Sequence, residues 1–284
     1  MDKQKLITAL KRQRNIKFLA VGLIGFGILL FFTNFLNFFG SFYGDLSMTT
    51  AFSGILIIIL GTLVLAHSNK ILKKEVVEAL VFEILLDDID DLVFTTDRSV
   101  DEDDFKEHIT FPGYDSFNSN DLISGTYRGH QLEISDLHLT RTQHNGKTTT
   151  TVTVFEGKVI KLAMPIKLEA EIKISQSSSL FKKSIALEDV EFNKLFNVES
   201  LDEHEVFYLL TPPMMEKIKL FKKTIDGDLY MTFSPNGYLY LAIDNHSNDF
   251  ELKLNDHDIG EIVARFKNEW QLVKDVLDQI IELF

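Results

Sequence analysis

Two long uncharged runs near the amino terminus constrain this chain more than any other feature of its 284 residues. Residues 18–39 and 48–66 contain no Asp, Glu, Lys or Arg. A bilayer core about 30 Å thick is crossed by roughly 20 helical residues, so each run is long enough to span it. Because few residues connect the two runs, the pattern predicts a transmembrane helical hairpin.

A cleaved signal peptide is the alternative for the first run. Signal peptides have an apolar core of about 7–15 residues and a small-residue cleavage site. The run 18–39 is longer than that, it ends in Asn-Phe-Phe-Gly, and a second apolar run follows it. The sequence therefore favours two spans over a signal peptide.

The basic residues beside the two spans predict the orientation, because cytoplasmic flanks carry an excess of Lys and Arg. The flank before the first span and the flank after the second are both basic, whereas the connection contains no Lys or Arg and has Asp45 as its one charged residue. We expect a multi-pass inner-membrane protein with both termini in the cytoplasm. Its first partner is then the lipid bilayer.

The expected spans contain no ionisable side chain, whereas channels and transporters usually need some. The hairpin therefore resembles an anchor rather than a pathway. We expect Gly22, Gly25, Gly54 and Gly61 to let its helices approach closely. A homo-oligomer, or an accessory subunit of a transport or envelope complex, stays open as an alternative.

Charge divides sharply along the chain. Residues 1–74 carry nine Lys or Arg and two Asp, whereas residues 75–284 carry 20 basic and 40 acidic residues. Nucleic-acid binding needs a cationic surface that displaces counterions from phosphates. The acidic part therefore argues against a nucleic-acid partner and against a domain lying flat on anionic lipid.

Hydrophobic periodicity divides the chain into four parts. They are a basic terminus (1–17), the transmembrane hairpin (18–67, with spans at about 18–39 and 48–66), a juxtamembrane helix or stalk (68–91) and a soluble acidic domain (92–284). The helix of the stalk is predicted over 69–91. The last part is predicted as α+β, with an antiparallel sheet packed against helices near 203–223 and 258–284.

The letters Gly146-Lys147-Thr148 resemble the end of a phosphate-binding loop. That motif needs a glycine five residues before Gly146, where this chain has Arg141, and it needs a helix afterwards. A β-branched run follows instead, and such residues favour strands. The stretch therefore predicts a hairpin turn at Asn145–Gly146 rather than a nucleotide site.

Other local patterns give further expectations. A change of apolar parity near Ser135–Asp136 predicts a β-bulge, and the stretch 191–200 is predicted to be irregular. A second hairpin is expected with its tip at 235–237. Met214 and Met215 are expected to fill the core.

No catalytic motif is visible, so we predict no catalytic, cofactor-binding or metal-binding residues and no cofactor. The strongest alternative is a polar site from Glu199, Asp202, His204 and Glu205 together with His138. The competing interpretation is that Ser200 and Glu203 form a capping box at a helix start.

The sequence also contains two groups of residues that could hold a metal ion. One combines Asp136, His138 and His144 on a strand, and the other uses the acidic stretch 87–91. Neither has the spacing of a known ligand signature, so neither is adopted.

The order of these features resembles the bacterial membrane proteins grouped as domain of unknown function 3137. The matching stretches are Gly125–Gly129 in "GTYRG", Phe155–Gly157 in "FEG" and the run from Asp202 to Pro212. The resemblance extends over nearly the whole chain and implies a bacterial inner membrane. It implies no established activity and supplies no catalytic residues.

Together these observations predict a membrane-anchored, cytoplasmic binding or scaffold module that is not an enzyme and has an unidentified protein partner. The alternative is a membrane-tethered enzyme, resembling a hydrolase, that uses residues 199–205 and His138.

Overall fold

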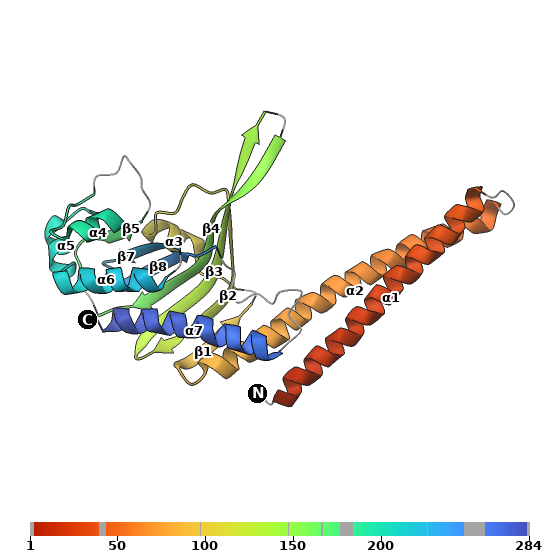
Figure 1. The fold of residues 1–284 in the computed structure, drawn as a ribbon, viewed down its shortest axis with the longest axis horizontal. Helices are drawn as coiled ribbons and strands as arrows, with labels where there is room; N and C mark the ends of the chain where they lie inside the picture. Colours follow the sequence, from red (N-terminus) through yellow and green to blue (C-terminus); the bar gives the residue numbers. More distant parts are fainter. Residues whose placement is uncertain are drawn as a thin grey trace. The chain divides into compact units, whose positions relative to one another are not determined.

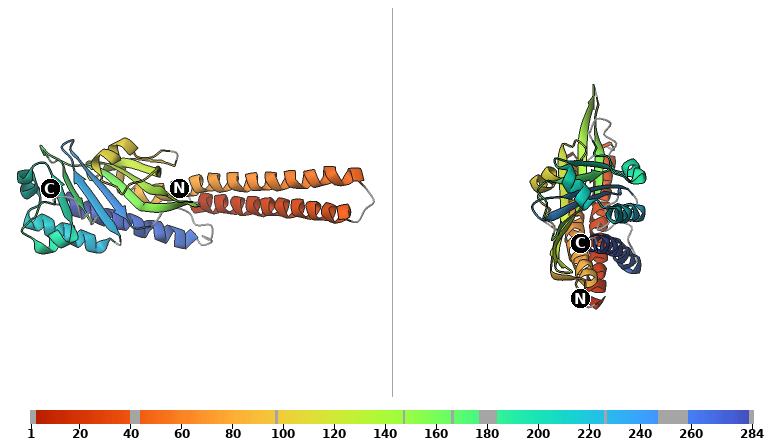
Figure 2. Two further views of the ribbon diagram at one scale, coloured as in Figure 1. Left: turned by 90° about the horizontal axis from the view of Figure 1, so that it is seen from above. Right: turned by 90° about the vertical axis from the view of Figure 1, so that its left-hand side faces the viewer.

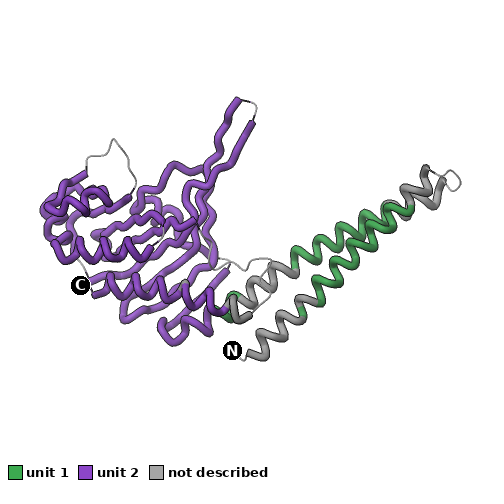
Figure 3. Tube along the Cα trace, viewed as in Figure 1, with its two compact units in different colours: residues 1–80 green, residues 81–284 purple. Residues whose placement is uncertain are grey.

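The computed structural model describes residues 3–39, 44–96, 98–146, 148–165, 167–176, 184–225, 227–246 and 259–282. The chain forms two compact units, Met1–Leu80 and Val81–Phe284 (Figure 3). Each unit is described by itself.

The first unit is a pair of helices, α1 (Lys3–Phe39) and most of α2 (Gly44–Leu85). A Cβ atom added to Gly27 would lie 2.8 Å from the carbonyl oxygen of Gly54, and one added to Gly61 would lie 3.2 Å from that of Ala20. The helices therefore run antiparallel and touch through small residues.

Only part of the expected glycine contact is correct. Gly54 and Gly61 lie at the contact, as predicted, but a Cβ atom on Gly22 or Gly25 would meet nothing within 4 Å. Gly27 takes their place, because it lies on the side of α1 that faces α2.

By length and composition, one helix in the described part of the chain can cross a membrane, at Asn15–Thr33, with a mean hydropathy of 2.2. Phe52–His67 is a shorter apolar helix. The second expected span, 48–66, is described only in part, because the side chains of residues 48–51 lie outside the described residues.

The second unit is built on an eight-stranded sheet in the order β1-β2-β3-β4-β8-β7-β5-β6, and every neighbouring pair is antiparallel (Figure 1). The strands are β1 (Ile89–Thr95), β2 (Ser116–Tyr127), β3 (His130–Asn145), β4 (Thr148–Ala163), β5 (Ile172–Ser175), β6 (Asn197–Ser200), β7 (Asp228–Phe233) and β8 (Tyr238–Asp244). The helices are α3 (Glu102–His108), α4 (Val190–Leu195), α5 (Glu203–Leu209), α6 (Pro212–Thr224) and α7 (Ile259–Ile281). This confirms the α+β class with an antiparallel sheet.

Helices cover both faces of the sheet (Figure 2). On one face, Phe105 of α3 packs in an apolar cluster with Leu139, Phe155 and Val159. On the other face, α7 buries the expected stripe, including Phe266, Trp270 and Leu277. The predicted core positions of Met214 and Met215 in α6 are confirmed, since both are buried.

The C-terminal helix is attached to the start of this unit by polar contacts. The carboxylate of Asp88 accepts hydrogen bonds from Trp270 Nε1 (2.7 Å) and from Lys274 Nζ (2.8 Å). Partial burial raises the pKa of Asp88, but these two hydrogen bonds together with the charges of Lys274 and Arg128 outweigh burial and leave that pKa below its ordinary value. Farther along α7, Asp278 accepts from Tyr127 and Arg128 at the β2–β3 turn.

Several predicted boundaries were wrong. The helix expected over 69–91 ends at Leu85, and Ile89–Thr95 is strand β1 because it pairs with β2. The stretch 191–200, predicted to be irregular, contains most of α4 and all of β6. Both elements are too short to leave a periodic pattern.

The expected β-bulge at Ser135–Asp136 is also misplaced. Strand β3 pairs with β4 without a break through these residues, and the irregularity lies opposite them in β2, between Asn120 and Ile123. Apolar parity changes in β3 because both faces of the sheet are covered there, so Ser135 and Asp136 are buried as well.

Both predicted hairpin turns are confirmed. Asn145 pairs with Thr148 across the first turn, where Gly146 has a φ of +63°, a left-handed conformation that glycine adopts easily. The second turn joins β7 to β8, and Gly237 there has a φ of +82°. A strand rather than a helix follows Lys147, so the stretch is not a phosphate-binding loop.

Candidate functional site

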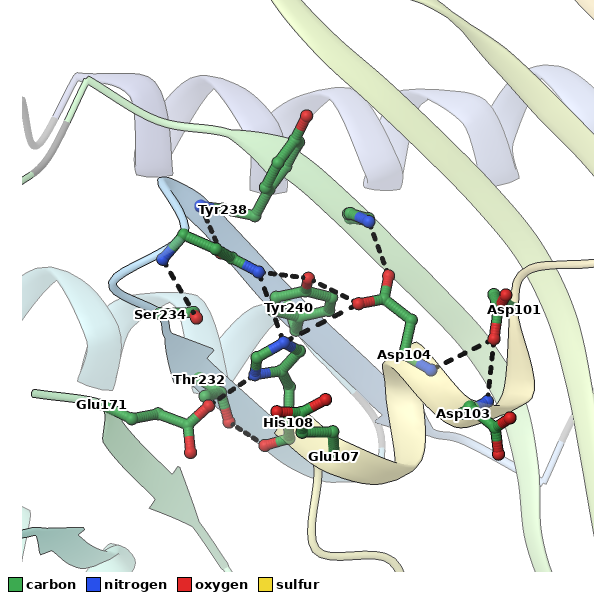
Figure 4. A network of polar contacts seen from close by, with 12 residues as sticks. Asp101, Asp103, Asp104, Glu107, His108, Glu171, Thr232, Ser234, Tyr238 and Tyr240 are labelled. Carbon is green, nitrogen blue, oxygen red and sulfur yellow. Dashed lines mark hydrogen bonds and ion pairs between the residues drawn. The ribbon is translucent and has the colours of Figure 1, made fainter.

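A polar network lies where α3 crosses the face of the sheet (Figure 4). Its members come from α3 (Asp104, His108), β4 (Lys161), the segment before β5 (Glu171), the β7–β8 turn (Asn236) and β8 (Tyr240). These residues lie far apart in the sequence, since 128 positions separate His108 from Asn236.

Local sequence explains the position of the two α3 residues. The Asp101 side chain caps the helix by accepting hydrogen bonds from the backbone N–H groups of Asp103 (2.9 Å) and Asp104 (3.2 Å). Asp104 and His108 are four residues apart and therefore share one face of the helix. That face lies over β8.

His108 is held on each side of its ring. Its Nδ1 lies 2.5 Å from Glu171 Oε1, and its Nε2 lies 3.3 Å from the side-chain nitrogen of Asn236. The ring stacks on Tyr240 at a centroid distance of 4.1 Å, and the His108 carbonyl accepts a hydrogen bond from Thr232. Only 8% of the residue is exposed.

The partners of His108 determine where its proton lies. A carboxylate only accepts, so Nδ1 carries the proton that bonds Glu171. The Asn236 side-chain oxygen accepts from the Tyr238 backbone N–H, so its nitrogen faces His108 and donates to Nε2. Nε2 also lies 3.7 Å from Asp104 Oδ1, so the ring has a carboxylate on each side.

The same amide begins a second chain of hydrogen bonds. Asn236 Nδ2 donates to the Tyr240 hydroxyl (2.8 Å), which donates to Asp104 Oδ1 (2.9 Å). Lys161 Nζ donates to the other oxygen of Asp104 at 2.5 Å. The pKa of Tyr240 is raised to about 12, because burial and the hydrogen bond to Asp104 raise it more than the hydrogen bond from Asn236 lowers it.

Lys161 lies between this network and a cavity. Its Nζ is 4.6 Å from the ring centroid of Tyr238 and 5.4 Å from that of Tyr240. Burial lowers the pKa of Lys161, but the hydrogen bond with Asp104 and nearby acidic groups outweigh burial and leave that pKa raised. Lys161 therefore stays charged at the cavity edge.

The cavity has a volume of about 320 Å³, within the range of small-ligand pockets. Its lining comes from four adjacent strands: Ser124, Gly125 and Thr126 of β2, Gln131, Leu132 and Glu133 of β3, Lys161 of β4 and Tyr238 of β8. Register explains this gathering, because Ser124, Glu133 and Lys161 of the lining form one row across the sheet, which Tyr240 continues on β8, two residues beyond Tyr238. The row combines a carboxylate, an ammonium group, a hydroxyl and an aromatic ring.

The residues of the alternative polar site are not brought together. His138 lies on β3 and bonds Thr153 Oγ1, whereas the 199–205 stretch begins in β6, with four strands between β3 and β6. Asp202, rather than the expected Ser200, is the N-cap of α5 and accepts from the His204 backbone N–H at 2.8 Å. Ser200 instead accepts a hydrogen bond from the Asp202 backbone N–H.

The residues of the two alternative metal sites make other contacts. Asp136 forms a buried ion pair with Lys158 at 2.9 Å, and His144 bonds Thr149. Asp88, in the acidic stretch, binds Trp270 and Lys274. Within the described part of the chain, no three His, Asp or Glu side chains are grouped so as to hold a metal ion.

Comparison with known proteins gives a family and one distant fold. The model of a family described as "Protein of unknown function (DUF3137)" matches residues 140–280, which confirms the resemblance over a shorter stretch than predicted. No curated protein matches the chain. The crystal structure of the mycobacterial trehalose monomycolate transport factor A is 10% identical, with a TM-score of 0.39 over 67% of this chain and 86% of that one.

The matched stretch includes two of the three motifs and leaves out Gly125–Gly129. Gly157 lies so close to β8 that an added Cβ atom would be 1.8 Å from the Ile243 carbonyl oxygen. Gly125 is similarly close to β1, where the Cβ atom would be 2.7 Å from the Asp90 carbonyl oxygen. These motif glycines therefore serve strand packing.

Proposed function

We propose that this chain, which belongs to the family of proteins of unknown function DUF3137, is a two-span inner-membrane protein with a cytoplasmic domain. The domain acts as a binding or scaffold module rather than as an enzyme. The proposal that the chain spans a membrane rests on the apolar outer surface of both helices of the first unit.

Large apolar side chains face outward on both helices. Phe18 and Leu19 of α1 are 81% and 67% exposed, and Phe52 and Leu56 of α2 are 68% and 69% exposed. In water such a surface would be hidden against another element, whereas lipid tails solvate it. Close contacts at Gly27 and Gly54 are typical of membrane helix pairs. The basic flanks support cytoplasmic termini.

The cavity supports the binding role. Among the described residues, the side chains of Ser124, Thr126 and Glu133 make no hydrogen bond or ion pair with one another or with a neighbour. Their polar atoms are therefore available to a ligand or a partner's side chain. His108, Asp104 and Tyr240 are engaged with one another, which favours a structural role for the network.

Reporter fusions test the topology. A reporter active only in the cytoplasm and one active only outside it are placed between residues 40 and 43 and after Phe284. We expect an outside signal at the first site and a cytoplasmic signal at the second. The same side at both sites would reduce the anchor to one span, and an outside signal after Phe284 would place the acidic domain in the envelope.

Partner capture tests the module. The full-length protein is recovered in detergent together with its bound proteins, and a Glu133→Lys variant is compared with wild type. Glu169→Lys is the matched control, since Glu169 is exposed and lies away from the cavity lining. We expect Glu133→Lys alone to lose the partner; equal recovery in all three proteins would remove the cavity from the proposal.

An enzyme remains the second candidate, because the Glu171–His108 pair resembles the acid–imidazole pair of many general bases. Against this role, His108 Nε2 faces Asn236, and none of the described Ser or Thr hydroxyls bonds that nitrogen. A His108→Gln variant decides between the two. Full complementation of a deletion strain by a folded variant would exclude an enzymatic role for His108, and loss of complementation with intact folding would favour that role.

A further inference from the structure

Strands β3 and β4 extend beyond their neighbours in the sheet. Pairing of β2 with β3 ends at Ser116 and Thr140, and pairing of β8 with β4 begins only at Gly157. Between these points the two strands pair with each other, and Figure 1 shows them projecting from the sheet. We name the residues 140–154 the arm. Its residues from Arg141 to Gly146 and from Thr148 to Thr151 are exposed.

The two edges of the arm differ. On the β3 edge, the Thr142 backbone N–H donates to the Asp115 carboxylate (2.6 Å), and the Asp115 N–H donates to the Thr140 carbonyl (2.8 Å). On the β4 edge, Asp244 accepts from the Glu156 N–H at the base of the arm. From Thr148 to Val154, the β4 edge has no backbone partner other than β3 among the described residues.

The open edge has one irregularity at its base, where the β3–β4 register shifts between Leu139 and Thr140 and leaves Val154 without a paired residue on β3. From Thr148 to Thr153 it lacks the usual protection. Residues 148–154 are Thr-Thr-Thr-Thr-Val-Thr-Val, all β-branched, with no charge, glycine or proline. Exposed edges in other proteins usually carry Lys, Pro or a bulge that prevents pairing with another chain. An uncharged β-branched run of this length is typical of segments that associate strand to strand.

Charge indicates which strand fits this edge. Residues 75–284 carry 20 basic and 40 acidic residues, so two copies of the domain repel each other. The stretch Leu137–Phe155 contains no acidic residue. Two copies therefore meet with least repulsion through their arms, which also hold the acidic bodies apart.

We infer that the β4 edge of the arm pairs antiparallel with the same edge of a second copy. Identical uncharged strands related by a twofold axis place Thr opposite Thr or Val, which are favourable cross-strand pairs. The product is a four-stranded ribbon, which is more stable than an isolated two-stranded one. This inference does not depend on the proposed function.

Cysteine cross-linking tests the pairing directly, because the chain contains no cysteine. A twofold axis brings only one residue of the edge opposite its own copy, so single cysteines are placed in turn at Thr149, Thr150, Thr151, Val152 and Thr153 of the full-length protein in detergent. Strand pairing brings facing Cα atoms to about 4.5–5.5 Å, within disulfide range. We expect a disulfide-linked dimer from at least one variant after mild oxidation.

Thr142→Cys is the matched control, since Thr142 lies directly opposite Thr151 on β3. In the four-stranded ribbon, the two copies of this position are three strands apart, about 14 Å, which is too far for a disulfide. No dimer from any open-edge variant, or equal cross-linking at Thr142, would overturn the inference.

Sedimentation in detergent supplies the second measurement. Val152→Lys places like charges in the paired edge, and we expect it to raise the dimer dissociation constant about tenfold or more. Thr142→Lys is its control, with circular dichroism confirming that both variants fold. A monomeric wild type would overturn the pairing, and so would a dimer that persists in Val152→Lys, because its contact would then lie outside the arm.

Discussion

Glu171 fixes the ring of His108, and its replacement by alanine measures what the polar network contributes to stability. Glu171→Ala removes the acceptor 2.5 Å from Nδ1. The His108 side chain is only 11% exposed, so water cannot fully replace the lost partner. An imidazole N–H is then left without an acceptor inside the domain.

The magnitude follows from that geometry. A buried donor left without its acceptor costs about 1–3 kcal/mol. Loss of the partly exposed pair between Glu171 and Lys173 (3.0 Å) adds no more than about 1 kcal/mol. A total of about 2 kcal/mol lowers the melting temperature by about 4–8 °C for a domain of this size.

Fluorescence is the suitable assay, because Trp270 is the only tryptophan and it packs in the folded domain. Its signal during heating reports on this domain and not on α1. Glu169→Ala is the control, since it removes the same charge two residues away at an exposed position. We expect the control to melt within about 1 °C of wild type.

A double-mutant cycle then separates the pair from its surroundings. If His108 and Glu171 act together, the destabilisation in His108→Ala/Glu171→Ala is smaller than the sum of the single effects by about 1 kcal/mol or more. The reasoning is refuted if Glu171→Ala melts like its control, or if the two single effects simply add.

Three further predictions concern pH and strand packing. The pKa of Asp88 is lowered by folding, so its carboxylate stabilises the domain above pH 3.8, the ordinary pKa, and this stabilisation is lost as pH falls through the folded-state pKa. The Asp88→Asn variant is therefore less stable than wild type near neutral pH, and the difference in stability shrinks in acid unfolding curves. The pKa of Tyr240 is raised by folding from 10.0 to about 12, so its neutral hydroxyl stabilises the domain below pH 10.0, and this stabilisation is lost as pH rises to about 12. The Tyr240→Phe variant should not show this loss of stability at alkaline pH in the same assay. Gly157→Ala puts a Cβ atom 1.8 Å from a carbonyl oxygen of β8 and costs about 3 kcal/mol or more in unfolding free energy, whereas Gly113→Ala, with nothing within 4 Å, stays within about 0.5 kcal/mol.

Elements with a strong local signal could be predicted from the sequence. The hairpin turn at Asn145–Gly146, the helix that begins at Pro212 and the apolar face of the C-terminal helix depend on turn chemistry, capping and periodicity, which neighbouring residues determine. Strand β1 could not be predicted, because the helical spacing of Val81, Ile84 and Leu85 continues into it without a break signal. Its conformation depends on pairing with β2, which the local sequence does not encode.

The polar network was missed for the same reason. Asp104 and His108 have helical spacing behind a good N-cap, Asp101, and that pattern could have indicated a shared face. Glu171 joins them because β5, which begins at the next residue, pairs with β7, and Asn236 joins them because the β7–β8 turn reaches α3. The local sequence does not predict which of these strands pair.

The pairing of β4 with β8 also affects how this chain folds during its synthesis. Strands β1 to β4 form a meander of neighbours that can assemble while the chain is still being synthesised, whereas residues 157–163 must wait for residues 238–244. Contacts between such distant segments close large loops and slow folding. During that interval β4 exposes its whole length to other nascent chains, a state prone to aggregation. Tethering each ribosome-bound chain to a membrane would keep such intermediates apart while the last strand and helix emerge.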